Sequence, residues 1–419
     1  MPGRLRRLPY FLALAFLIAC GRPDSAQTRE PPVPRPTPQL SATPPPPITR
    51  PEIDATSIYE AEEGTRIVNA DIPVSGDARE FGRLIDRLSE PGGYFPSDNL
   101  VSNETSYLHV LGKMREMGVR GGAYVGVGPD QNFSYVAHIR PSIAFIIDIR
   151  RDNLLHHLLF KALFENARNR LEYLCLMLGK PLPDDLREWD DASIDEIVVY
   201  VDTAVASPEI FEKADALLLE SVKRFGYPLS EADLGTISGI HALFYDYGLD
   251  IRYSNRGRGP YGRFPSWRLL ILETDLDGVR RGYLASEHSF RAVKDLEHRN
   301  LIVPVVGDLA GPHALAAIGR EIASRRLRIS AFYVSNVEQY LMQGPGFDAF
   351  AQTVARLPFD DRSILIRSYF ARRYPIPQTV PGHFSTQLLE HFTDFVREQS
   401  QGGYRSYIDL VTRNAIPLN

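Results

Sequence analysis

The stretch GGAYVGVGPDQNFSYVAHIRPSIAFIIDIRR, residues 121–151, predicts a strand, a glycine turn, a helix and a second strand that ends in an acid. The apolar run 123–125 is followed by Gly126 and Gly128, which let the backbone of a turn pass close to a ligand. The second apolar run ends at Asp148, about 20 residues beyond the glycines, where a carboxylate can accept hydrogen bonds from both ribose hydroxyls. The alternative is a tight turn without a ligand, because two glycines in a GxG pattern are a weak signal.

The same alternation of strand and helix returns toward the end of the chain. Near-continuous apolar runs predict strands at 301–306, 329–334 and 363–367. Helices are predicted at 78–90, 103–118, 152–178, 207–225, 289–300, 313–325 and 347–356. Apolar runs of this kind are typical of strands buried on both faces of a parallel sheet. The sequence therefore predicts an α/β fold with a doubly wound, mostly parallel, Rossmann-like sheet.

A long connection is expected between the second and third strands. About 150 residues separate Asp148 from the third strand, far more than a usual crossover needs. We expect a large, mostly helical insertion at about 180–290, within one domain that covers 56–419 or within two domains. Residues 252–267 are rich in Gly, Arg and Tyr and predict a long loop, which is either a lid over a site or a variable insertion.

The first 20 residues predict a bacterial lipoprotein signal peptide. Three arginines within the first seven residues form a basic start, and the apolar stretch 11–18 is too short to span a bilayer. The order Leu-Ile-Ala-Cys at 17–20 matches a lipobox, in which Cys20 becomes the lipid-bearing first residue. An ordinary cleaved secretory signal is the alternative. The lipobox predicts a protein of the bacterial cell envelope, anchored in a membrane through Cys20 and facing away from the cytoplasm.

Residues 21–55 predict a linker between the signal and the folded part. Ten prolines fall between Pro31 and Pro51, and little in the stretch could be buried. Proline-rich chain is extended and semi-rigid. The linker therefore either holds the folded domain away from a membrane surface or acts as a disordered spacer.

Charge, cysteines and histidines narrow the classes of function. The formal net charge of −5 argues against a nucleic-acid partner. Cys175 lies among leucines and predicts a buried thiol rather than a nucleophile. The adjacent His156 and His157 point in different directions on a helix, so we expect one to be packed and one exposed. Their spacing does not suit metal ligands, and no metal site is predicted.

Polar residues follow four of the predicted strands. Ligands of a parallel α/β sheet bind at the carboxyl ends of its strands, which makes these residues the candidates for a site. The same residue types also cap helices, and that is the alternative for each of them. The candidates are Gly126, Gly128 and Asp130 after the first strand, Asp148 and Arg150 after the second, Asp308 after the third, and Asn336, Glu338 and Tyr340 after the fourth.

These segments resemble the class I S-adenosylmethionine-dependent methyltransferases. The sequence GVGPD at 126–130 is similar to the glycine loop of that family, which holds the cofactor. The resemblance implies that Asp148 binds the ribose hydroxyls, that Asp308 contacts the adenine edge, and that Asn336 lies near the transferred methyl group. The segments GVGPDQNFSY, FIIDIRRDN, PVVGDLAG and FYVSNVEQYL also resemble a family of bacterial proteins with this core and no assigned activity.

The chain departs from the methyltransferase pattern at the glycine loop. That family usually has an acid two positions before the first loop glycine, where this chain has Tyr124. Pro129 and Asp130 stand where the family has small residues. The methionine end of the cofactor would therefore be held differently, or not at all.

Two hypotheses from different classes follow. The first is a methyltransferase that uses S-adenosylmethionine on a small molecule or an envelope component, with Glu338 or Tyr340 orienting the acceptor. The second is a non-catalytic envelope lipoprotein that binds another nucleoside-like or anionic ligand, or a protein partner, with the same fold. The export signal motivates the second, because S-adenosylmethionine is not expected to be supplied outside the cytoplasm.

Overall fold

Six strands form one sheet in the computed structural model, which describes residues 77–254, 264–370 and 375–418. All of these residues belong to one unit, 68–419. The strand order is β3-β2-β1-β4-β5-β6, with β6 antiparallel to β5 and the other pairs parallel. The α/β class with a mostly parallel sheet is therefore confirmed. The strands are β1 Ala123–Gly126, β2 Ile143–Asp148, β3 Ile302–Val306, β4 Ile329–Ser335, β5 Ile364–Tyr369 and β6 Thr386–His391.

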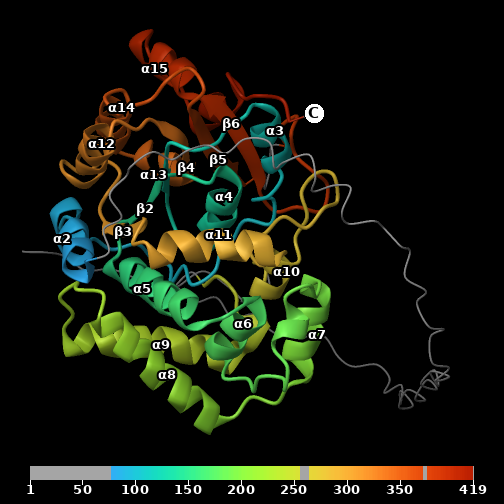
Figure 1. The fold of residues 1–419 in the computed structure, drawn as a ribbon. Helices are drawn as coiled ribbons and strands as arrows, with labels where there is room; N and C mark the ends of the chain where they lie inside the picture. The colour runs from blue at the N-terminus through green and yellow to red at the C-terminus, as the bar shows by residue number, and fades with distance from the viewer. Residues whose placement is uncertain (1–76, 255–263, 371–374, 419) are drawn as a thin grey trace, which may run out of the picture. The chain divides into compact units, whose positions relative to one another are not determined.

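Helices precede, separate and follow these strands (Figure 1). The described residues between β2 and β3 hold α5 to α11, so the helical insertion expected at about 180–290 begins earlier, at Arg151. The helices are α2 Ala78–Leu88, α3 Leu111–Glu116, α4 Gln131–Ile139, α5 Arg151–Asn166, α6 Arg170–Leu178, α7 Ile194–Thr203, α8 Pro208–Lys223, α9 Glu231–Tyr247, α10 Trp267–Ile271, α11 Glu287–His298, α12 Ala314–Ser324, α13 Val337–Leu341, α14 Gly346–Val354, α15 Phe392–Ser400 and α16 Tyr407–Thr412.

The helices pack in groups around the sheet. Helix α5 contacts β2 and β3, and α11 packs against both α5 and α4. Helices α6, α8 and α9 pack against α5, and Figure 1 shows them together in green. Helices α2 and α12 contact each other and the β3–β2 side of the sheet, while α14 and α15 lie toward β6. The long insertion therefore adds a helical group beyond α5 and does not interrupt the sheet.

The single helix predicted at 152–178 is wrong, because the chain breaks between α5 and α6. Asn169 starts α6, and its side chain accepts a hydrogen bond from the backbone of Glu172. Lys294 ends α5 by donating its ammonium to the carbonyls of Phe164 and Ala167. The helix predicted at 103–118 is also too long, since only Leu111–Glu116 is α-helical there.

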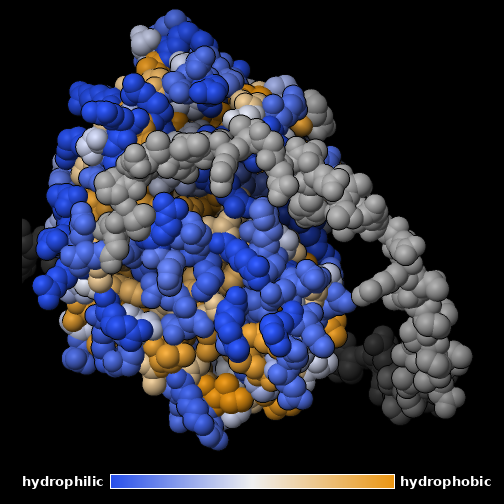
Figure 2. Space-filling view, in the orientation of Figure 1, coloured by the Kyte–Doolittle hydropathy of each residue, from blue (hydrophilic) through white to orange (hydrophobic). Residues whose placement is uncertain are grey.

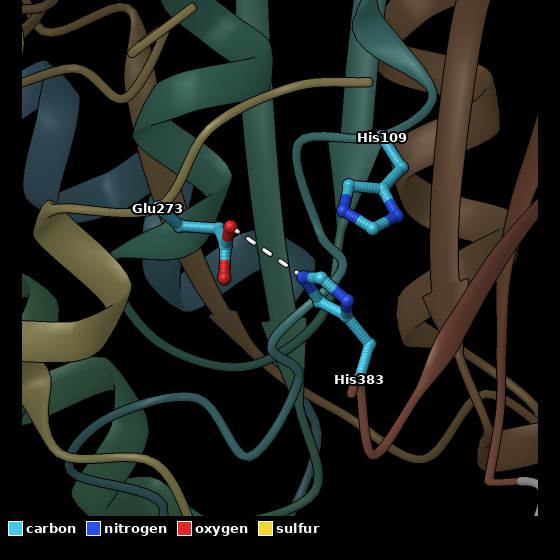
Figure 3. A group of neighbouring side chains, drawn as sticks. All are labelled: His109, Glu273 and His383. Atoms are coloured by element: carbon cyan, nitrogen blue, oxygen red, sulfur yellow. Dashed lines mark ion pairs between the residues drawn. The ribbon is translucent and has the colours of Figure 1, made fainter. Parts of the chain in front are cut away.

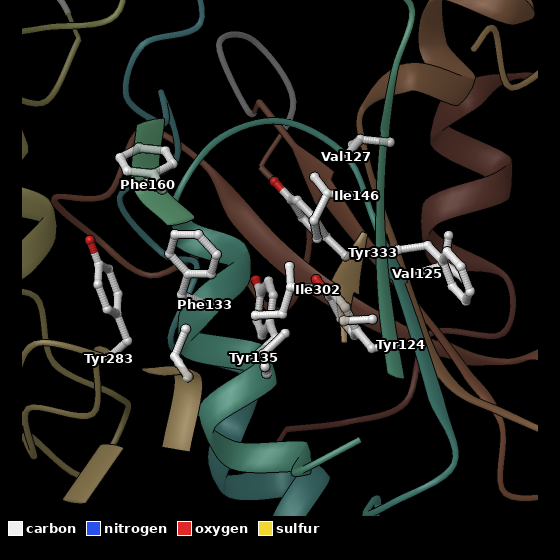
Figure 4. Packing of buried hydrophobic residues seen from close by; sticks show 14 of the residues in the cluster. Tyr124, Val125, Val127, Phe133, Tyr135, Ile146, Phe160, Tyr283, Ile302 and Tyr333 are labelled. Carbon is white, nitrogen blue, oxygen red and sulfur yellow. The ribbon is translucent and has the colours of Figure 1, made fainter. Parts of the chain in front are cut away.

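The core is aromatic around the start of α4 (Figure 4). The Phe133 ring meets Phe160 and Phe164 edge to face, with centroids 5.4 and 5.3 Å apart, and Tyr283 at 5.3 Å. Pairs of this geometry contribute about 0.5–1.5 kcal/mol each beyond the apolar area that they bury. Cys175 is buried, and burial raises the pKa of its thiol to about 12, in keeping with the predicted inert thiol.

The surface seen in Figure 2 is mainly hydrophilic, and its hydrophobic residues gather over the region of α6, α8 and α9. A mostly apolar groove there is lined by α8 and by α6 with the loop after it, including Leu182 and Leu217. Across the described parts of the chain, no helix combines the length and apolar character that a bilayer crossing requires. The predicted signal peptide, Cys20 and the linker lie outside the described residues.

Candidate functional site

A pocket of about 220 Å³ lies at the carboxyl ends of four adjacent strands. Its wall includes Gly128 after β1, Asp148 at the end of β2, Asp308 after β3 and Ser335 at the end of β4. The strand order reverses at β1, between its neighbours β2 and β4, and such a reversal is where open α/β sheets bind ligands. Because a water molecule needs only about 10–15 Å³ of such space, this pocket has room for a much larger ligand.

The pocket brings together most of the residues that the sequence singled out. Those in its wall are Gly128, Asp148, Asp308, Asn336 and Tyr340. Gly126, Asp130 and Glu338 lie elsewhere, and their surroundings explain why.

The glycine loop is held from within the protein. A side chain at Gly126 would come within 2.0 Å of Asn132 Oδ1, which accepts a hydrogen bond from the Tyr124 hydroxyl at 2.7 Å. Gly126 therefore makes room for Asn132, not for a ligand. Gly128 has a φ of +85°, a backbone conformation that favours glycine, and its carbonyl accepts from His157 Nε2 at 2.9 Å.

The burial of His156 and His157 differs from what the sequence predicts. Both His156 and His157 are buried, whereas one was expected to be exposed. Burial lowers the pKa of His157 to about 4, so the ring is neutral at neutral pH and donates its Nε2–H to Gly128. The second histidine therefore supports the pocket from behind the glycine loop, which sequence spacing could not reveal.

Asp148 enters the pocket wall with its carboxylate already paired to Arg150. The backbone N–H and Nε of Arg150 donate to Oδ1 at 2.9 and 3.1 Å, and Nη2 donates to Oδ2 at 2.9 Å. Arg150 is held in turn by the carbonyls of Ser97 and Asp98, at 2.9 and 2.7 Å. A carboxylate offers about four acceptor positions, so a ligand hydroxyl can still bind Asp148.

Asp308 lies in a loop that is organised by Glu90. Glu90 Oε1 accepts the backbone N–H of Asp308 at 2.9 Å, and Oε2 accepts those of His313 and Ala314 at 3.1 Å, at the start of α12. The Asp308 side chain accepts the N–H of Ala310 at 2.9 Å through Oδ1. Its other oxygen, Oδ2, is thus the atom that could receive a hydrogen bond from a ligand.

Glu104 is a buried acid in the pocket wall that the sequence analysis missed. It accepts hydrogen bonds from the Tyr333 hydroxyl at 2.6 Å, from Ser335 Oγ and from Gln387 Nε2. Ser335 has a φ of +53°, which is uncommon for a residue other than glycine. Glu104 lies in a segment expected to be helical, and nothing in its local pattern distinguishes it from a surface glutamate.

The charged residues that line the pocket within the described chain are all acidic: Glu104, Asp148 and Asp308. A phosphate placed there would face the like charges of Glu104 and Asp308 in a partly buried site, which is unfavourable. The lining therefore disfavours an anionic ligand, which the sequence left open, and favours a neutral or positively charged one.

Tyr340 lies at the solvent side of the pocket, with 45% of its surface exposed. Its ring meets Phe95 edge to face, with centroids 5.1 Å apart. Asn336, also in the pocket wall, follows Ser335 at the end of β4 and directly precedes α13. The two rings present aromatic surface on which a planar ligand could pack.

Glu338 is fully buried and does not face the pocket, which corrects its predicted role of orienting an acceptor. Arg367 on β5 donates to both of its carboxylate oxygens, at 2.5 and 3.1 Å. The same guanidinium pairs with Glu390 on β6. Glu338 thus belongs to a buried ion network between α13 and the β5–β6 edge of the sheet.

Asp130 is also buried away from the pocket, which corrects its predicted place in a cofactor-binding loop. Its Oδ2 accepts hydrogen bonds from Trp267 Nε1 at 2.8 Å and from the Tyr283 hydroxyl at 3.1 Å. Burial raises the pKa of Asp130 from 3.8 to about 6, although both hydrogen bonds oppose the shift. Asp130 therefore anchors α10 and the loop before α11 to the start of α4.

The burial of Asp130 predicts a pH-dependent transition that the fluorescence of Trp267 can follow. Between pH 3.8 and about 6 the folded state keeps the Asp130 proton while the unfolded chain has lost it, so stability falls as pH rises through that window. We expect Trp267 fluorescence to change with a midpoint near pH 6 in a Trp189→Phe background, which leaves one tryptophan. Asp130→Asn should abolish the transition. A transition that survives in Asp130→Asn would assign it to another group.

A protein-family model matches this chain. The model of a domain of unknown function (DUF7790) matches residues 100–188 and 270–416, which together cover more than half of the chain. The matched segments contain all six strands and the three pocket acids, and the stretch between them holds α7 to α9. No curated protein matches the chain. The chain therefore belongs to the DUF7790 family, a domain of unknown function.

Proposed function

We propose that the pocket binds S-adenosylmethionine and that the protein is a methyltransferase-like lipoprotein with an unidentified acceptor. The observation that carries the proposal is the convergence of Gly128, Asp148, Asp308 and Asn336 in one pocket at the carboxyl ends of β1 to β4. These are four of the positions that the methyltransferase resemblance assigned to the cofactor. They come from segments up to about 200 residues apart, and the sheet brings them to the carboxyl ends of adjacent strands, where ligands of such sheets bind.

The sheet and the charge of the pocket support this choice of ligand. The order β3-β2-β1-β4-β5-β6 suits a Rossmann-like, doubly wound domain, in which nucleotides bind at the order reversal. Cofactors with a pyrophosphate would place negative charge against Glu104, Asp148 and Asp308. S-adenosylmethionine has no phosphate, and its sulfonium and ammonium outweigh its one carboxylate, so the acidic lining would attract this net positive ligand.

The residues present suit the nucleoside part of this cofactor. The remaining acceptor position of Asp148 would take a ribose hydroxyl, and Asp308 would take the adenine amino group. When bound, the cofactor would supply an activated methyl group. Tyr340 at the pocket opening would help to orient the acceptor, and Glu104 would accept a proton where the acceptor must lose one.

A second candidate is a binding protein for a nucleoside-like ligand without methyl transfer. The hydrogen bond between Tyr124 and Asn132 fills the space beside Gly126, where the methyltransferase resemblance would place the methionine end. The predicted export signal favours the same candidate. In either case we propose that the mature protein is tethered to a membrane of the cell envelope through a lipid on Cys20.

Calorimetric titration with S-adenosylmethionine, S-adenosylhomocysteine and adenosine separates these candidates. We expect micromolar binding of S-adenosylmethionine, and weaker binding of S-adenosylhomocysteine because it lacks the sulfonium charge. Adenosine binding as tightly as either would support the nucleoside-binding candidate instead. Failure of all three to bind at millimolar concentration would contradict both candidates.

A further inference from the structure

Three metal-ligating side chains face one another in a cluster that shares no residue with the pocket wall (Figure 3). His109 lies in the turn before α3, Glu273 follows α10, and His383 precedes β6. Their nearest ligand atoms all lie within 4.8 Å of one another, and His383 Nε2 is 3.6 Å from Glu273 Oε1. The imidazole rings of His109 and His383 are 4.4 Å apart between centroids.

The surroundings keep these side chains available for a ligand. His109 is 5% exposed. The buried Nδ1 of His383 lacks a partner among the described residues, and its Nε2 is the nitrogen that faces Glu273. Glu273 is positioned by the N–H of Thr274, which donates to Oε1 at 2.9 Å.

We propose that His109, Glu273 and His383 bind a divalent transition-metal ion of the Zn²⁺ type. Two imidazoles and one carboxylate form a donor set that zinc prefers, with one coordination position left for water or another ligand. Tetrahedral ligands at about 2.0–2.1 Å from zinc lie roughly 3.4 Å apart, so the cluster needs to contract by little more than 1 Å.

The ion would tie together three segments that already touch. The Tyr107 hydroxyl donates to the carbonyl of Leu270 at 2.9 Å, and the N–H of Phe384 donates to Thr105 Oγ1 at 3.1 Å. Two residues beyond His383, Ser385 Oγ lies 2.9 Å from Ser106 Oγ. These contacts hold the ligands in place before a metal arrives, which lowers the ordering cost of binding it.

The cluster is connected to the pocket through buried polar residues. Ser106 Oγ donates to Gln387 Oε1 at 3.1 Å, and the amide nitrogen of Gln387 donates to the pocket acid Glu104. A metal that fixes the turn bearing His109 would therefore also fix the position of Glu104. The metal site is independent of which ligand the pocket takes.

The test is a metal titration of the whole protein, prepared without a histidine tag and stripped with a chelator. We expect one Zn²⁺ per chain, and one Co²⁺ that gives the visible absorption of a site with fewer than six ligands. Glu273→Gln, which keeps the side-chain volume, and His109→Ala should each weaken Zn²⁺ binding by at least about 100-fold. His298→Ala removes an exposed histidine outside the cluster and should leave binding unchanged.

Each outcome decides the proposal. Stoichiometric binding that is lost in Glu273→Gln and kept in His298→Ala supports it, and circular dichroism checks that each variant is folded. Absence of stoichiometric binding would overturn the proposal. Binding that is unaffected by both Glu273→Gln and His109→Ala would also overturn it, because the ion would then lie elsewhere.

Discussion

Asp148→Ala is expected to weaken binding of S-adenosylmethionine by about 10- to 150-fold. In the proposed complex Asp148 accepts one hydrogen bond from the ribose, and a hydrogen bond to a charged group contributes about 1.5–3 kcal/mol. The substitution also frees the Nε and Nη2 of Arg150, while Nη1 keeps the carbonyls of Ser97 and Asp98. Some loss of stability is therefore expected alongside the loss of affinity.

Calorimetry on Asp148→Ala, with a denaturation curve on the same sample, separates affinity from stability. The matched control is Asp233→Ala, which breaks the Arg151–Asp233 pair, with a nitrogen–oxygen distance of 2.7 Å, outside the pocket wall. Asp233→Ala should lose stability but keep its affinity. If Asp148→Ala binds as tightly as the unaltered protein, Asp148 does not hold the ribose.

Arg367→Met is expected to destabilise the fold by about 3–5 kcal/mol. The Arg367 side chain is 2% exposed, and it pairs with two carboxylates, those of Glu338 and Glu390, which are 0% and 3% exposed. Removing the guanidinium would leave both acids buried without a counter-charge, which is among the most costly single changes in a protein interior. Burial already raises the pKa of Glu338, and Arg367 is the group that opposes this shift.

Urea denaturation measures the loss in Arg367→Met. The control is Arg397→Met, which removes an arginine that is 50% exposed and paired with Asp394, and which should cost less than about 1 kcal/mol. Adding Glu338→Gln and Glu390→Gln to Arg367→Met should recover part of the stability, because no buried charge then lacks a partner. Equal losses in the two methionine variants would mean that the buried network contributes no more than a surface pair.

The α/β class could be predicted because its signals are local. Runs such as 143–147 and 301–306 are too apolar to face water, and strands of this kind occur in parallel sheets covered by helices. The antiparallel β6, with the sequence TQLLEH, was not predicted, because its polar residues give no apolar run. Pairing with β5 at the end of the sheet, rather than its own composition, makes this segment a strand.

The candidate site could be predicted in part for the same reason. Asp148 ends a strand, and Gly128 and Asp308 each come two residues after one, so strand prediction alone places them at one edge of the sheet. Glu338 and Asp130 occupy equivalent positions in the sequence but turn into the interior, where Arg367 and Trp267 receive them. Position after a strand does not determine which way a side chain points.

What the sequence by itself determined was thus the order of the elements, the parallel sheet and the acids that follow its strands, since each depends on neighbours along the chain. The tertiary structure alone decided the rest. Glu104 meets Tyr333 across 229 residues. The rings of His109 and His383 are 4.4 Å apart, although these two residues are still farther apart in the sequence. Such contacts carry no local pattern, because packing brings their partners together only after the sheet and the long helical connection have formed.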